Sequence, residues 1–112
     1  MPRLIPGHGA AIVPALFRKD LADDFIRVSD LDCVVGCRRL VNTEAILAGG
    51  SSGAVIMAIK RMREALPADS TCLAILADRG ERYLDSIYDD AWVNKHFGDI
   101  RELWQDDNWA QR

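Results

Sequence analysis

The chain has 112 residues, of which 49% are hydrophobic and 28% are charged, and its formal net charge is −3. This balance is typical of one small globular domain and excludes an intrinsically disordered chain. No apolar run reaches the roughly 20 residues that span a bilayer, and an acidic chain without a basic stripe argues against a nucleic-acid partner.

The cysteines indicate a reducing compartment. There are three of them, an odd number, and no long apolar segment at the start of the chain suggests secretion. We therefore expect a cytoplasmic protein with free thiols. Cys33 and Cys37 could share a helix face, but no further ligands stand at metal-binding spacing, so core packing is favoured over a metal site.

The first part of the chain predicts a loop, a strand and a helix. Two glycines beside a proline indicate a loop at 6–11, and the apolar residues of 25–28 predict a short strand. Ser29 and Asp32 have the spacing of a capping box, so a helix is expected from there to about Val41.

The middle of the chain alternates between strand and helix patterns. A brief apolar strand at 45–48 and a glycine-rich turn at 49–53 precede the strongest predicted helix, at 54–66. Pro67 ends that helix, and the continuous apolar run at 72–77 predicts the interior strand of a parallel sheet.

The last part predicts a turn at 78–80, a short helix near 83–88 and an acidic tail with one more helix. The alternation of strands and helices predicts an α/β fold with a parallel sheet and right-handed crossovers. We expect 1–90 to form the sheet domain and 91–112 to form a helical tail.

The segment 45–53 leaves three hypotheses open. In the first, Ser51 or Ser52 simply caps the following helix. In the second, a cofactor loop uses the glycines and the helix N-terminus to approach a flat ligand. In the third, Ser51 is the nucleophile of a G-x-S-x-G elbow. The acid and base of that elbow would come from the following residues: Asp78 or Asp89, and His96.

Three blocks of the sequence resemble one family in order and spacing. The block at 44–55 is similar to the "EGILAGISSGAA" block of cysteine synthases and to the "GGSAG" block of cystathionine β-synthase. Residues 76–84 resemble "DRGDRYLS", and residues 7–14 resemble "GIGAGFIP". The chain, over about 4–90, thus resembles the C-terminal part of fold-type-II pyridoxal-phosphate enzymes. The resemblance implies a partial three-layer α/β/α sheet domain.

The resemblance also implies a binding site for pyridoxal 5′-phosphate. In this family the first serine of the block, here Ser51, hydrogen-bonds the pyridine nitrogen of the cofactor. The glycines that the resemblance places at the cofactor are Gly7, Gly9 and Gly50. A neutral hydroxyl leaves the pyridine unprotonated, which suits β-elimination and β-replacement.

The resemblance places three further residues near the substrate, namely His8, Asp78 and Arg79. It implies no catalytic residue in this chain, because the family's Schiff-base lysine lies in an N-terminal half that the chain lacks. No lysine of the chain stands in a matching motif: Lys19, Lys60 and Lys95. We expect the chain alone to be inactive, and the complete enzyme to be a homodimer that acts on amino-acid substrates.

Within the family, residues 3–10 and 32–39 look most like the 2,3-diaminopropionate branch, which serves siderophore-type biosynthesis. Those enzymes form an aminoacrylate from O-phosphoserine and add glutamate to it. A cysteine synthase that uses sulfide is the alternative within the family. A non-catalytic interaction module is the alternative outside it.

Overall fold

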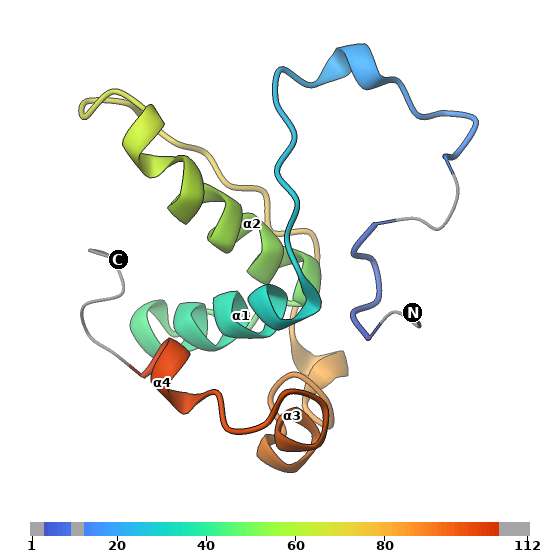
Figure 1. The fold of residues 1–112 in the computed structure, drawn as a ribbon, viewed down its shortest axis with the longest axis vertical. Helices are drawn as coiled ribbons and strands as arrows, with labels where there is room; N and C mark the ends of the chain where they lie inside the picture. The colour runs from blue at the N-terminus through green and yellow to red at the C-terminus, as the bar shows by residue number, and fades with distance from the viewer. Residues whose placement is uncertain (1–3, 10–12, 106–112) are drawn as a thin grey trace.

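The computed structural model describes residues 4–9 and 13–105 (Figure 1). Parts of the predicted loop at 6–11 and of the tail lie outside these described residues. The principal elements are two crossing helices, α1 (Asp30–Glu44) and α2 (Gly50–Met62). The shorter elements are η1 (Lys19–Leu21), η2 (Arg63–Ala65), η3 (Glu81–Tyr83), α3 (Asp90–Phe97) and α4 (Arg101–Trp104).

The predicted α/β sheet is wrong for the described residues, which contain helices and no β-strand. The segments at 25–28, 45–48 and 72–77 do not assemble into a ladder. A single antiparallel bridge joins Ala48 to Arg79, where the parallel sheet of an α/β/α domain was expected. An apolar run becomes an interior strand only when neighbouring strands pair with its backbone, and the described residues supply no such neighbour.

The exposure of residues 72–77 also contradicts the predicted sheet, because this run was expected to be its buried interior strand. Leu73 and Ile75 are 88% and 76% exposed, and Cys72 is exposed as well. A run of apolar residues alone does not distinguish a buried strand from an unpaired segment, because the spacing of apolar residues does not say whether another strand lies beside the run.

Helix α1 begins where local chemistry predicted. The Ser29 hydroxyl accepts a hydrogen bond from the Asp32 amide, and the Asp32 carboxylate accepts one from the Ser29 amide, both at 3.1 Å. The predicted capping box is therefore confirmed. The helix runs to Glu44, three residues past the expected end, and Ala45 closes it at a φ of 56°.

Helix α2 begins four residues earlier than predicted, at Gly50, and its C-terminal turn tightens into η2. It packs on α1 through two glycines. A Cβ atom added to Gly53 would lie 2.0 Å from the carbonyl oxygen of Cys33, and one added to Gly36 would lie 2.2 Å from the carbonyl oxygen of Gly53. The two backbones therefore touch directly at the crossing.

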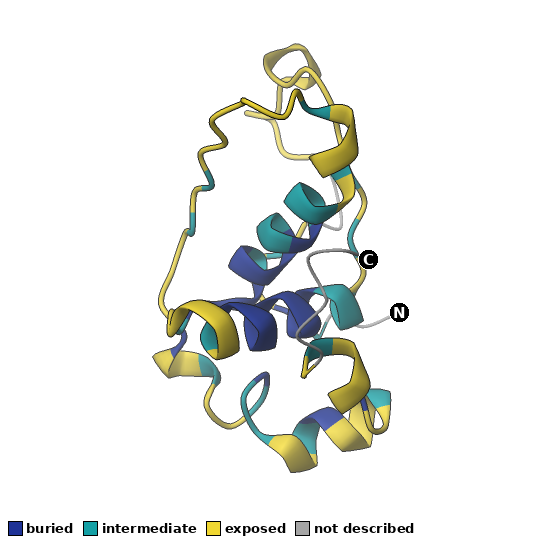
Figure 2. Cartoon of the chain, turned by 90° about the vertical axis from the view of Figure 1, so that its left-hand side faces the viewer, coloured by how far each residue is buried: buried dark blue, intermediate teal, exposed yellow. Residues whose placement is uncertain are grey.

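The core lies around this crossing and extends to the turns that follow η3. Figure 2 shows the buried residues concentrated on α1 and the first turns of α2, while the outer end of α2 is more exposed. The buried apolar cluster consists of Ile5, Cys33, Val34, Val35, Cys37, Ala54, Met57, Ile87, Val93 and Ile100. No helix in the described part of the chain is long and apolar enough to cross a membrane.

The two buried cysteines belong to this core. Burial raises the pKa of Cys33 to about 12 and that of Cys37 to about 11, and the Cys37 thiol donates to the Gly49 carbonyl over 3.2 Å. Among the described residues, no group of three or more histidine, cysteine or acidic side chains could hold a metal ion. These thiols therefore pack as small apolar side chains.

We expect iodoacetamide at pH 8 to alkylate Cys72 in the folded chain and to leave Cys33 and Cys37 unmodified, because only a thiolate reacts and only Cys72 is exposed. Peptide mass spectrometry would locate the label, and a sample in urea would provide the fully labelled control. Equal labelling of all three cysteines in the folded chain would contradict the buried positions of Cys33 and Cys37.

Candidate functional site

The N-terminus of α2 has no side-chain cap. Gly49 is the N-cap residue, so neither serine of the block fills the capping role that one hypothesis gave it. Among the described residues, the hydroxyl of half-buried Ser51 has no hydrogen-bond partner. The hydroxyl of Ser52, which is 0% exposed, also has none. The hydroxyl of Ser51 is thus available to a polar ligand at the positive end of the helix, whereas that of Ser52 is enclosed by the protein.

The structure brings two of the three family-like blocks, 44–55 and 76–84, together at this helix end. The Gly49 amide donates to the Asp78 carbonyl over 3.1 Å, and a Cβ atom on Gly49 would lie 1.9 Å from an Asp78 carboxylate oxygen. A Cβ atom on Gly50 would lie 2.2 Å from a side-chain methyl group of Ile5, which precedes the glycine loop. Glycines are therefore required where these segments meet.

The residues expected near a substrate lie in different surroundings. Asp78 is beside Gly49, and its carboxylate accepts a hydrogen bond from the Tyr83 hydroxyl over 2.6 Å. Arg79 pairs with Glu81 over 3.0 Å, and its side chain is 86% exposed.

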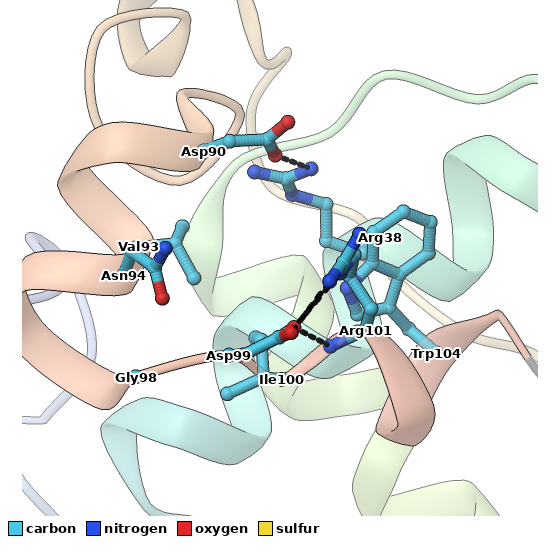
Figure 3. A pocket seen from close by; sticks show the side chains of 9 residues that line it. All are labelled: Arg38, Asp90, Val93, Asn94, Gly98, Asp99, Ile100, Arg101 and Trp104. Atoms are coloured by element: carbon cyan, nitrogen blue, oxygen red, sulfur yellow. Dashed lines mark hydrogen bonds and ion pairs between the residues drawn. The ribbon is translucent and has the colours of Figure 1, made fainter.

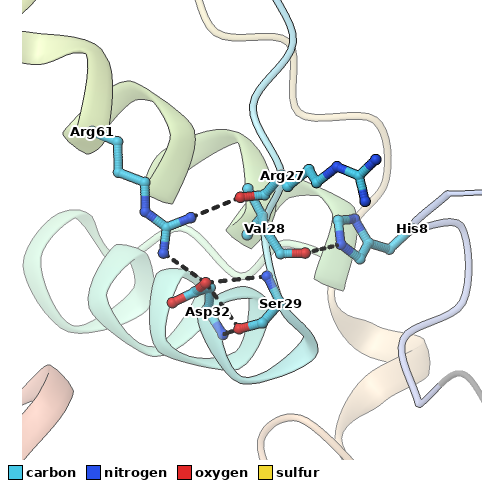
Figure 4. Close-up of polar contacts among 6 residues, drawn as sticks. All are labelled: His8, Arg27, Val28, Ser29, Asp32 and Arg61. Carbon is cyan, nitrogen blue, oxygen red and sulfur yellow. Dashed lines mark hydrogen bonds and ion pairs between the residues drawn. The ribbon is translucent and has the colours of Figure 1, made fainter. Parts of the chain in front are cut away.

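His8 stands between Gly7 and Gly9, which have φ angles of 76° and 80°. A ring nitrogen of His8 lies 2.7 Å from the carbonyl oxygen of Val28 (Figure 4). The described contacts thus place Asp78 at the helix end, whereas the side-chain contacts of His8 and Arg79 lie elsewhere.

The open cavity beside His8 contains an arginine, Arg61, that makes two hydrogen bonds across it. Arg61 of α2 donates to the Asp32 carboxylate over 2.7 Å and to the Arg27 carbonyl over 2.9 Å (Figure 4). Burial raises the pKa of Asp32, but the hydrogen bonds from Arg61 and Ser29 outweigh it and hold this pKa below its usual value. The arrangement ties α2 to the start of α1.

Of the acids in the nucleophile-elbow hypothesis, Asp78 lies beside Gly49, but Asp89 and the base His96 make their contacts elsewhere. The His96 ring packs against Trp92 with ring centroids 4.5 Å apart, and the Asp89 carboxylate accepts a hydrogen bond from the Trp92 amide over 3.1 Å. Within the described residues, neither His96 nor Asp89 forms a hydrogen bond with Ser51. The structure therefore gives no geometric support to a serine triad.

Sequence reasoning missed a buried arginine in α1. Arg38 is 8% exposed, donates to the Ile87 carbonyl over 2.9 Å and to the Asp90 carboxylate over 2.8 Å, and lies over the Trp104 ring. It lines a cavity between α1, α3 and α4 (Figure 3). The available signal was its position four residues after the apolar Val34, because residues four apart in a helix share a face.

Comparison with known proteins places these features in a family context. No protein-family model matches the chain. The N-(2-amino-2-carboxyethyl)-L-glutamate synthase of Ralstonia nicotianae is 52% identical over 92 residues, which are 82% of this chain and 27% of that protein. The synthase of the same name from Cupriavidus metallidurans is 49% identical over 94 residues, which are 81% of this chain and 28% of that protein.

The chain thus spans little more than a quarter of the length of the curated relatives it matches. The branch predicted from the sequence blocks is the one to which these relatives belong by name, so that resemblance is confirmed. The chain is a homologue, over about four fifths of its length, of the N-(2-amino-2-carboxyethyl)-L-glutamate synthases.

Proposed function

We propose that the chain is the C-terminal part of an enzyme that joins O-phosphoserine to L-glutamate and releases phosphate. The product would be N-(2-amino-2-carboxyethyl)-L-glutamate. The observation that carries the proposal is the 52% identity to a synthase named for this product. In the reaction, the bond between the β-carbon and the phosphate oxygen breaks. The glutamate nitrogen forms the new bond to this carbon and gives up a proton.

The residues at the N-terminus of α2 fit the pyridoxal 5′-phosphate that such an enzyme would use. Ser51 stands at the start of this helix with a hydroxyl that has no described partner, and Gly49 and Gly50 let the segments of Asp78 and Ile5 pack close beside it. Ser51 would donate a hydrogen bond from its hydroxyl to the unprotonated pyridine nitrogen. When bound, the cofactor supplies an electron sink at the substrate's α-carbon.

The remaining groups at this site would shape the substrate region. The Tyr83 hydroxyl holds the Asp78 carboxylate beside Gly49, so that a negative charge faces the same helix end. The lysine that binds the cofactor would come from the rest of the enzyme, because no lysine of this chain stands in a matching motif. In this proposal the rest of the enzyme supplies the lysine, and this chain helps to position the cofactor.

A hybrid enzyme tests the role of Ser51. The matching 92-residue region of the Ralstonia nicotianae synthase is replaced by that of this chain, and turnover is measured with O-phosphoserine and glutamate. Ser51→Ala should lower turnover by about tenfold or less, because one neutral hydrogen bond contributes roughly 0.5–1.5 kcal/mol. Ser51→Asp should lower it further, because a carboxylate favours the protonated pyridine.

Ser70→Ala is the matched control, since Ser70 is an exposed serine after α2 and should leave turnover unchanged. If Ser51→Asp were as active as the unchanged hybrid, the assigned hydrogen bond would be wrong. Complete loss of turnover in Ser51→Ala would instead indicate a nucleophile.

A further inference from the structure

The cavity between α1, α3 and α4 has a volume of about 270 Å³, and Figure 3 shows the side chains that line it. Pockets for drug-sized ligands span roughly 300–1,000 Å³, so this one suits a molecule with few heavy atoms. It involves none of the residues at the N-terminus of α2. Its walls combine the apolar side chains of Val93 and Ile100 with the ring of Trp104 and several charged groups.

The buried guanidinium of Arg38 has one nitrogen that donates no hydrogen bond to the described residues. Its Nε donates to the Ile87 carbonyl and its Nη1 to the Asp90 carboxylate, but its Nη2, which is buried, has no partner among the described residues. The Arg38 side chain is only 10% exposed. An unpaired buried donor on a cation is unfavourable, and a ligand carboxylate is the group that matches it best.

The cavity is not simply cationic. Two arginines and two aspartates line it, so that their formal charges cancel: Arg38, Arg101, Asp90 and Asp99. Arg101 binds the Asp99 carboxylate through Nε and Nη2 over 2.9 and 2.7 Å. These hydrogen bonds lower the pKa of Asp99 to about 2, which keeps it ionised at neutral pH. A simple anion would therefore meet two negative charges beside its cationic partner.

We propose that this cavity binds a small α-amino acid as a zwitterion, with its carboxylate at Arg38 Nη2 and its ammonium group at Asp90 and Asp99. A zwitterion can pair its carboxylate with an arginine and its ammonium group with an aspartate, and it adds no net charge to a neutral cavity. The Asp90 side chain is 89% exposed, which leaves an entrance for exchange with solvent. Such a site would let an amino acid act on the protein away from the proposed cofactor position.

Titration calorimetry of the 112-residue chain with L-alanine tests the proposal, with propionate and L-alaninamide as analogues that carry one charge each. L-alanine should bind saturably with one site per chain. Each analogue should bind about tenfold more weakly or worse, because it loses one charged hydrogen-bonding partner. Propionate binding as tight as that of L-alanine, or no saturable binding of L-alanine, would overturn the proposal.

Variants locate the site. Asp99→Asn keeps an oxygen acceptor for the Arg101 amide but removes the charge, and it should weaken L-alanine binding by about tenfold. Asp20→Asn is the matched control, because Asp20 also pairs with an arginine two residues away, over 2.8 Å, and is similarly exposed. This control should bind L-alanine like the unchanged chain.

Arg38→Met should abolish binding, but it also leaves the Ile87 carbonyl without its donor and can unfold the chain. Circular dichroism melting of each variant separates lost binding from lost structure, and Asp99→Asn remains decisive because both side chains of its ion pair are exposed. Equal effects of Asp99→Asn and Asp20→Asn would overturn the assignment. None of these measurements depends on the proposed synthase reaction.

Discussion

Replacing Gly53 with alanine should lower the free energy of unfolding by about 1–3 kcal/mol, although alanine is the better helix former. The added Cβ atom would lie 2.0 Å from the Cys33 carbonyl oxygen and 2.8 Å from the Cys37 sulfur. The first of these neighbours is helix backbone, which cannot rotate away as a side chain does. Helices α1 and α2 would have to separate, and the core around their crossing would loosen.

Urea unfolding followed by circular dichroism measures this change. Asn42→Ala is the control, because Asn42 is exposed in α1 and its replacement should raise stability by a few tenths of a kcal/mol through helix propensity alone. If Gly53→Ala were as stable as the unchanged chain, the direct contact of the two backbones would be wrong.

Removing the hydroxyl of Tyr88 should lower the free energy of unfolding by about 1–3 kcal/mol. This hydroxyl donates to the Ala48 carbonyl over 2.5 Å and accepts from the Ala48 amide over 3.2 Å. Ala48 is only 2% exposed, so Tyr88→Phe would leave two buried backbone groups without a partner. Burial raises the pKa of Tyr88, which keeps its hydroxyl protonated and able to donate.

Tyr83→Phe is the matched control for Tyr88→Phe. It also removes one tyrosine hydroxyl, but the hydrogen bond of that hydroxyl to Asp78 is exposed, so its loss should cost less than about 1 kcal/mol. Chemical denaturation of both variants gives the comparison. Equal losses would show that the Ala48 backbone finds other partners when the hydroxyl is absent.

The start of a helix was predictable from the sequence where the residues that fix it lie within a few positions of one another. Ser29 and Asp32 specify the start of α1 between themselves, and the small residues after Gly49 mark the start of α2 to within four residues. The run at 72–77 failed as a predicted strand because a sheet depends on partners that the run itself does not contain.

The roles of the site residues stay predictions, but one contact between their sequence blocks is observed. The sequence blocks around Gly49 and Asp78 were expected to act together, and the structure places them in contact. Arg61 could not be assigned, because a charged residue on a helix is usually solvated and only tertiary contacts reveal its ion pair. For Arg38 the position on the face of Val34 was a signal, but its partners Ile87 and Asp90 come from tertiary contacts.

The product of the hybrid enzyme tests the proposed function most directly. With O-phosphoserine and L-glutamate, the Ralstonia nicotianae synthase carrying the matching region of this chain should release phosphate. Mass spectrometry should detect N-(2-amino-2-carboxyethyl)-L-glutamate in equal amount. Sulfide offered in place of glutamate should give little cysteine. A folded hybrid that yields only cysteine, or no product while the unmodified synthase is active, would contradict the proposed function.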